Sequence, residues 1–201
     1  MGNDRFYRLQ EKNKYTKHLG GKVKKIYIIL TMTGTMVSRI VKVYTRKKYG
    51  HVSISLDKKL KNMYSFGRLK ATNPFVGGFV HESKNHGTFY RFKDTTATIY
   101  SLEIEDEKYE KLEKEIEYFK KTRREYGFNA IGLFAVAAHL KIKRKNKYYC
   151  AEFVHELLER AGVHIEFPNI IKPEDFLKIP GLKKVYDGYL RDYTVVNKKV
   201  R

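Results

Sequence analysis

A chain of 201 residues fits a single domain, and a hydrophobic content of 42% with 14% aromatic residues is typical of a globular protein rather than a disordered one. The single cysteine excludes an intramolecular disulfide framework and a cysteine-rich zinc site. The formal charge of +20 favours anionic partners, although lysine is spread along the whole chain and a solvated surface explains the charge equally well.

The first 22 residues are polar, basic and poorly patterned. They predict a flexible basic arm, residues 1–22, that precedes one domain over residues 23–201. The start of the chain lacks the apolar segment of a secretory signal. We therefore expect a cytoplasmic protein without a transmembrane segment, with peripheral attachment to a membrane as a further option.

The first part of the folded region predicts an antiparallel hairpin. β-branched and aromatic residues indicate a buried strand over 25–31, and helical spacing indicates a short helix over 36–42. Segment 51–57 alternates between apolar and polar residues, so it predicts a strand with His51 on its polar face. A loop then leads to a partner strand over 62–66.

The middle of the chain predicts two further strands and a long helix. Asn73-Pro74 and Gly77-Gly78 indicate two breaks in the chain. Strands are expected over 88–92 and 97–104. An amphipathic pattern predicts a helix that begins at Asp106 and runs to about Arg124.

The last third of the chain predicts two helices with different surroundings. The most apolar segment, 128–142, is too short to span a bilayer and predicts a buried helix. Residues 141–147 carry five basic side chains and must be exposed. An amphipathic helix then follows Cys150 and closes at Gly162.

Cys150 is the most informative residue, because it lies at or just before the start of that last helix. Unpaired N–H groups and the helix dipole stabilise a thiolate there, and the thiolate is the nucleophilic form of cysteine. A cysteine on a helix and a histidine on a strand, here His51, are the parts of a nucleophilic site. A lone cysteine is also commonly a small buried hydrophobe, and the pattern alone leaves both interpretations open.

The chain order of these parts resembles the circularly permuted branch of the papain-like NlpC amidase superfamily. The segments His51-Val52-Ser53-Ile54-Ser55 and Tyr149-Cys150-Ala151-Glu152-Phe153-Val154 carry the resemblance. That branch includes YiiX-like bacterial proteins and relatives of lecithin:retinol acyltransferase. The resemblance implies an α+β fold of the permuted papain-like type, in which an antiparallel sheet packs against helices.

The resemblance also implies the role of each site residue. Cys150 attacks a carbonyl carbon, and His51 takes and returns the proton. A third polar residue orients the histidine, and two candidates stay open: Ser65 on the next predicted strand, and Glu82 after the double glycine. Tyr149 is a candidate for binding substrate because it precedes the nucleophile. We expect no cofactor and no metal.

The sequence therefore predicts a cysteine hydrolase of the amidase, peptidase or acyl-ester type. The resemblance implies a cell-wall peptide or an acyl lipid as substrate. The alternative is a catalytically inert basic module that binds nucleic acid or an anionic membrane or polymer, with nucleic acid the less favoured partner. Salt would weaken such binding steeply, and Cys150 would not affect it.

Overall fold

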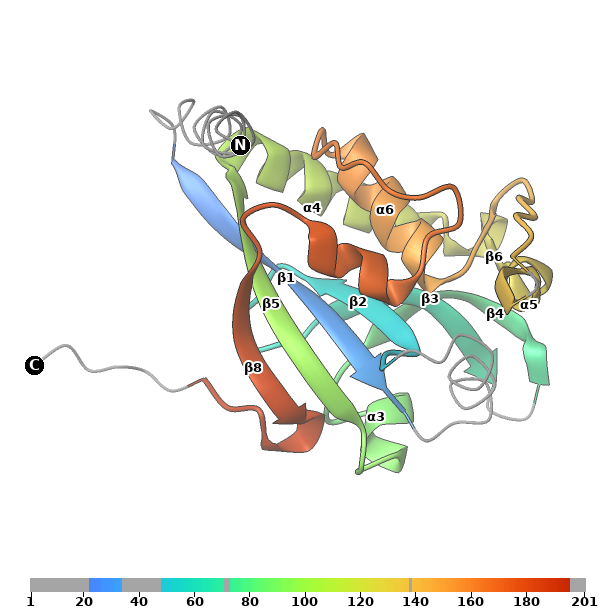
Figure 1. Ribbon diagram of the computed structural model, residues 1–201, viewed down its shortest axis with the longest axis horizontal. Helices are drawn as coiled ribbons and strands as arrows, with labels where there is room; N and C mark the ends of the chain where they lie inside the picture. The colour runs from blue at the N-terminus through green and yellow to red at the C-terminus, as the bar shows by residue number, and fades with distance from the viewer. Residues whose placement is uncertain (1–21, 34–47, 71–72, 138, 196–201) are drawn as a thin grey trace, which may run out of the picture.

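The computed structural model describes residues 22–33, 48–70, 73–137 and 139–195. This part of the chain forms an α+β structure with a six-stranded antiparallel sheet, which confirms the predicted class (Figure 1). All but the last residue of the expected arm over 1–22, and the expected helix over 36–42, lie outside the described residues.

The six-stranded sheet has the order β4-β3-β2-β1-β5-β8, and every neighbouring pair is antiparallel. Its strands are β1 (Val23–Met32), β2 (His51–Ser55), β3 (Met63–Lys70), β4 (Asn73–Glu82), β5 (Thr96–Glu105) and β8 (Lys183–Tyr189). β1 lies between β2 and β5, and both of its faces are buried, because Ile26, Ile28 and Leu30 belong to the larger core and Tyr27 and Ile29 to a smaller core on the other face.

The remaining elements are helices, 3-10 turns and one short pair of parallel strands. They are α3 (Gly87–Arg91), α4 (Asp106–Lys121), η1 (Arg123–Glu125), β6 (Gly127–Phe128), α5 (Ala130–Ala137), β7 (Lys147–Tyr148), α6 (Cys150–Arg160), η2 (Pro173–Lys178) and η3 (Leu190–Asp192). The helix α4 has the predicted apolar stripe, because Leu112, Ile116 and Phe119 are buried at helical spacing.

An aromatic cluster fastens α6 to the sheet and to α4. The ring of Phe153 on α6 lies 4.7 Å from Phe66 of β3, 5.2 Å from Phe119 of α4 and 5.7 Å from Phe79 of β4, measured between centroids. These separations are those of favourable offset and edge-to-face contacts. Because β3, β4 and α4 all contact the ring of Phe153, they fix the position of α6 and of its first residue, Cys150.

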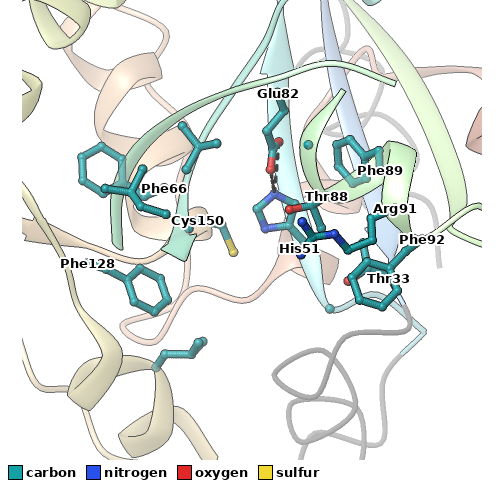
Figure 2. A pocket seen from close by; sticks show the side chains of 16 residues that line it. Thr33, His51, Phe66, Glu82, Thr88, Phe89, Arg91, Phe92, Phe128 and Cys150 are labelled. Atoms are coloured by element: carbon teal, nitrogen blue, oxygen red, sulfur yellow. Dashed lines mark hydrogen bonds and ion pairs between the residues drawn. The ribbon is translucent and has the colours of Figure 1, made fainter. Parts of the chain in front are cut away.

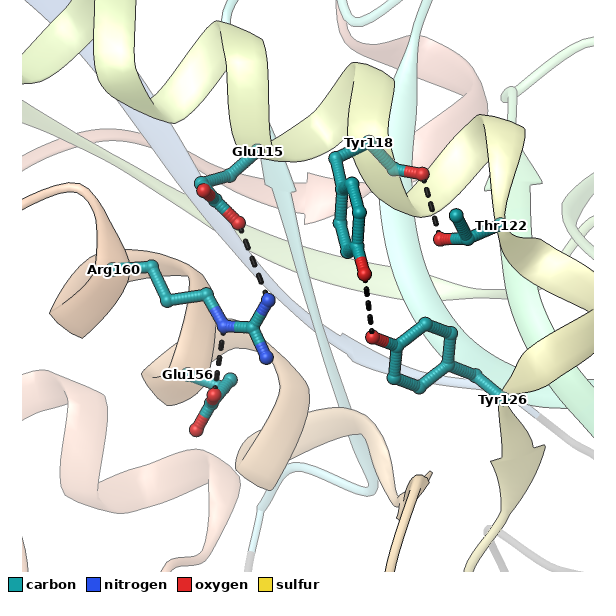
Figure 3. A network of polar contacts seen from close by, with 6 residues as sticks. All are labelled: Glu115, Tyr118, Thr122, Tyr126, Glu156 and Arg160. Atoms are coloured by element: carbon teal, nitrogen blue, oxygen red, sulfur yellow. Dashed lines mark hydrogen bonds and ion pairs between the residues drawn. The ribbon is translucent and has the colours of Figure 1, made fainter.

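A polar cluster joins α4 to α6 at the protein surface (Figure 3). Arg160 donates from Nε to Glu156 at 2.8 Å and from Nη1 to Glu115 at 3.4 Å. Its guanidinium also lies 5.0 Å from the ring centroid of Phe119. Partly exposed ion pairs add little stability, so these contacts mainly set how the two helices lie against each other.

The opposite face of the sheet carries a smaller core that includes Ile29, Ile99 and Phe89. The predicted strand over 88–92 is wrong, because these residues form most of the short helix α3. Gly87 has a φ of +66°, which turns the chain, and Phe89 is then buried against the sheet at 5% exposure. Packing of one aromatic ring overrides the strand propensity of its neighbours.

The predicted break at Gly77-Gly78 is also wrong, because β4 runs through both glycines. A Cβ atom at Gly77 would lie 2.4 Å from the carbonyl oxygen of Gly67 and 2.7 Å from the Cβ of Phe128. The glycine is therefore required for close approach of the backbone to its neighbours, and not for a bend.

The predicted buried helix over 128–142 is shorter and more exposed than expected. α5 ends at Ala137, and Ile131 and Phe134 are 48% and 42% exposed. The apolar composition indicates a helix but does not indicate which of its faces is buried, because hydrophobic periodicity is weak when most residues are apolar. Among the described residues, no helix has the length and apolar character needed to cross a membrane.

Candidate active site

Cys150 is the first residue of α6, as predicted. The backbone N–H of Tyr149, the residue before the helix, donates to the carboxylate of Glu152 at 3.3 Å, which closes the first turn. Cys150 is only 6% exposed, but it lines a pocket of about 220 Å³. The thiol therefore lies at the N-terminal end of α6 and borders a cavity.

His51 is the first residue of β2 and faces the same pocket. The bond from the Gly50 N–H to the carbonyl of Thr31, at 3.0 Å, fixes the entry of the chain into this strand. His51 Nε2 lies 3.0 Å and 3.3 Å from the two carboxylate oxygens of Glu82 (Figure 2). Because Nε2 is occupied, Nδ1 is the ring nitrogen left for Cys150, whose sulfur lies beside the imidazole.

Glu82 ends β4 and is held by a second donor. The hydroxyl of Ser53, two residues after His51 on the same face of β2, donates to Glu82 Oε2 at 2.5 Å. Glu82 pairs with Met63 across the β3–β4 ladder, and this register, rather than a bend at the glycines, carries the carboxylate to the imidazole.

Ser65, the other candidate for orienting the histidine, lies opposite Val80 in the same ladder. Its Oγ is buried and makes no hydrogen bond of regular geometry to the described residues, although the hydroxyl is close enough to help lower the pKa of Glu82. Of the two candidates, the structure brings Glu82 into contact with His51.

The electrostatics of the pair favour two charged groups. Burial lowers the pKa of His51, but the charge of Glu82, the nearby Cys150 sulfur and the hydrogen bond to Glu82 raise that pKa well above its usual value of 6.5. Burial raises the pKa of Glu82, but the charge of His51, the hydrogen bonds from His51 and Ser53, and the nearby Ser65 hydroxyl lower it overall. The contacts of the pair therefore favour an imidazolium beside a carboxylate.

The pocket forms where β2 and β3 separate. In the described chain these two strands share one ladder pair, Ile54 with Tyr64, whereas β3 and β4 stay paired over most of their length. Aromatic side chains such as Phe66, Phe89 and Phe128 line the pocket beside the polar site (Figure 2). Such walls exclude water and strengthen the interactions between charges inside the pocket.

Tyr149, the expected substrate-binding residue, does not line this pocket. Its buried hydroxyl donates to the carbonyl of Ile171 at 3.0 Å, and burial raises the pKa of Tyr149. The side chain instead borders a cavity of about 20 Å³ on which Cys150 also opens. The structure gives Tyr149 a packing role, and its binding of substrate stays a prediction.

Two polar residues near the site were not predicted from the sequence. Ser53 could have been found, since it lies on the same face of its strand as His51. Asn129 is fully buried; its side chain accepts from the Gly132 N–H at 3.0 Å and donates to the Ile142 carbonyl at 2.9 Å. Asn129 thus closes the start of α5, and only the tertiary structure shows this.

Neither a metal site nor a family relationship is found. Within the described ranges, no group of three or more histidine, cysteine, aspartate or glutamate side chains is arranged to hold a metal ion. A scan against protein-family models and a search of curated proteins gave no match to this chain.

Proposed function

We propose that this protein is a cysteine hydrolase that cleaves an amide or an ester. One observation carries the proposal: the imidazole of His51 lies between the carboxylate of Glu82 and the sulfur of Cys150, at the wall of a pocket. A nucleophile, a proton carrier and a residue that orients it are the parts that covalent acyl transfer requires.

In the first half of the reaction, the Cys150 thiolate attacks the carbonyl carbon and a carbon–sulfur bond forms. The imidazolium of His51 stabilises the thiolate before attack. The N–H of Cys150, which belongs to the unpaired first turn of α6, donates to the oxyanion. His51 Nδ1 then gives its proton to the leaving nitrogen or oxygen, the bond to the leaving group breaks, and a thioester remains.

In the second half, water attacks the thioester. His51, now neutral, takes a proton from the water, and the carbon–sulfur bond breaks to release a carboxylic acid and restore the thiolate–imidazolium pair. Glu82, held by the hydroxyl of Ser53, keeps the ring of His51 oriented and favours the imidazolium.

Assignment to the permuted papain-like NlpC superfamily is part of the proposal. Three features support it: the histidine precedes the cysteine in the chain, the histidine lies on a strand of an antiparallel sheet, and the cysteine begins a helix packed on that sheet. The substrate classes implied by the resemblance are cell-wall peptides and acyl lipids. The aromatic pocket walls favour a substrate with an apolar acyl group.

The test uses p-nitrophenyl butyrate as a generic acyl donor. Wild-type protein is expected to release nitrophenolate and to carry a butyryl group on Cys150, seen by mass spectrometry after an acid quench. Cys150→Ala should show neither signal. His51→Ala should lower the acylation rate by about a hundredfold or more, because general acid–base catalysis contributes at least that much.

His164→Ala is the matched control, since His164 is an exposed histidine that contacts Glu159 outside the pocket. It should behave as the wild type. Alkylation of Cys150 by iodoacetamide is measured in parallel, so that a poor choice of ester does not decide the outcome. Equal alkylation rates in the wild type and in His51→Ala at pH 6 contradict the proposal.

A further inference from the structure

Exposed apolar side chains gather on and just after α5. Ile131 and Phe134 are 48% and 42% exposed, and their spacing of three residues places them on one face of the helix. Leu140 and Ile142, in the segment that follows, are 58% and 38% exposed. Residues 131–142 therefore present four large apolar side chains to solvent.

The segment after α5 folds back toward the start of the helix. The N–H of Leu140 donates to the carbonyl of Ala135 at 2.9 Å. The buried Asn129, at the start of the helix, donates to the carbonyl of Ile142 at 2.9 Å. Both ends of α5 are thus bonded to the segment that follows it, so the four exposed apolar side chains lie on this helix or on the chain held against it.

The same segment carries a dense positive charge. Lys141, Lys143, Arg144 and Lys145 are exposed, and no aspartate or glutamate occurs between Glu125 and Glu152 in the sequence. None of these four side chains forms an ion pair within the described part of the chain, and Lys141 bonds instead to the side chain of Asn169. Glu152 and Glu156 lie beside this segment, in the lining of a shallow pocket.

We propose that α5 and residues 139–147 form a docking surface for an anionic membrane. Apolar side chains flanked by lysine and arginine suit the boundary between lipid head groups and acyl chains, where the apolar groups insert and the cations meet anionic head groups. A nucleic acid would use the charge but not the four apolar side chains, so the combination favours a lipid surface.

Docking in this way brings the Cys150 pocket to the bilayer. Leu133 of α5, Phe128 just before this helix, and Cys150 all line that pocket. The docking surface stands on its own exposed residues, and it holds whether or not Cys150 is catalytic.

The test is flotation of the full chain with vesicles of phosphatidylcholine alone or of an equal mixture with phosphatidylglycerol. Binding is expected only to the mixed vesicles and should fall as salt is added. The variant K143E/R144E/K145E should bind at least about a hundredfold more weakly, since each of the three basic residues near an anionic surface contributes about a fivefold factor. The variant I131S/F134S should also lose binding, by about tenfold or more.

A charge-matched control is K59E/K93E/K114E, which changes three exposed lysines on other elements. These lysines have no ion-pair partner among the described residues, and the control should retain most of the binding. An equal loss of vesicle binding in this control would overturn the proposal, because binding would then depend on the overall charge of the protein and not on this surface. Wild-type affinity of I131S/F134S would also overturn it, and together with salt-sensitive binding to duplex DNA it would point to a nucleic-acid surface.

Discussion

The helices α5 and α6 are both rich in apolar residues, but they differ in how much of that apolar surface is buried. In α6, Phe153, Val154 and Leu157 are fully buried. In α5, which has the more apolar sequence, Ile131 and Phe134 remain largely exposed. The amount of apolar surface in a helix therefore does not decide how much of it is buried.

The difference lies in how the apolar residues are arranged around each helix. In α6 they form one stripe opposite a charged face, so the helix has one favourable packing orientation on the sheet. This orientation fixes the position of Cys150. In α5 they surround the helix, so burial of Ala130 and Val136 in the core leaves Ile131 and Phe134 partly uncovered. The first arrangement fixes Cys150 beside the pocket, whereas the second leaves apolar side chains exposed.

The largest expected contrast between the two helices is in stability. Phe153→Ala should lower the free energy of unfolding by about 3–5 kcal/mol, because it empties the centre of a closely packed aromatic cluster. Phe134→Ala should lower it by only about 1 kcal/mol, since 42% of this residue is exposed already. Urea unfolding followed by circular dichroism measures both values. Similar losses in the two variants would show that α5 is packed as firmly as α6.

A smaller effect is expected where the segment before α5 meets the sheet. Gly77→Ala places a methyl group against the Gly67 carbonyl and Phe128, so it should cost about 1–3 kcal/mol of unfolding free energy. Gly67→Ala is the control on the neighbouring strand, because its added Cβ would lie at an ordinary 3.8 Å from Val80. Thermal unfolding should show a clearly lower midpoint for Gly77→Ala than for Gly67→Ala.

The smallest effect concerns pH and the pair formed by His51 and Glu82. The raised pKa of His51 gives a stabilisation that is fully present below 6.5 and is lost as pH rises through the folded-state pKa. The lowered pKa of Glu82 gives a second stabilisation, which is present above pH 4.5 and is lost as pH falls through the folded-state pKa of Glu82. The midpoint difference between wild type and Glu82→Gln should therefore be largest between about pH 4.5 and 6.5.

Melting curves recorded from acid to alkaline pH check this window. The difference should shrink on both sides, toward strong acid and toward alkaline pH. His164→Ala serves again as the control, because its site is exposed and separate from the pair. A midpoint difference that stays constant from pH 6 to pH 9 would mean that His51 and Glu82 are not coupled as the structure indicates.

Much of the fold could be predicted because its main elements have clear periodicity. The strands β1 and β5 and the helices α4 and α6 follow alternating, continuous or amphipathic patterns. The predictions failed where packing of one group outweighs the local pattern. Phe89 inserts into the smaller core as part of a helix, and Gly77 allows close approach within an unbroken strand.

The candidate site shows the same division. The sequence around each residue predicts that Cys150 lies at the start of a helix and His51 at the start of a strand, because both positions depend on local sequence. The choice between Ser65 and Glu82 depends on the register of β3 and β4 and on the separation of β2 from β3, and local sequence does not encode either.

The sequence by itself determined the elements with a clear periodic pattern, the positions of the thiol and the imidazole within two of them, and the positive charge. Only the tertiary structure decided that Glu82 completes the site and that part of α5 stays uncovered. The reason is physical: a periodic pattern records which side of an element avoids water, whereas contacts between distant segments depend on how all the elements pack together.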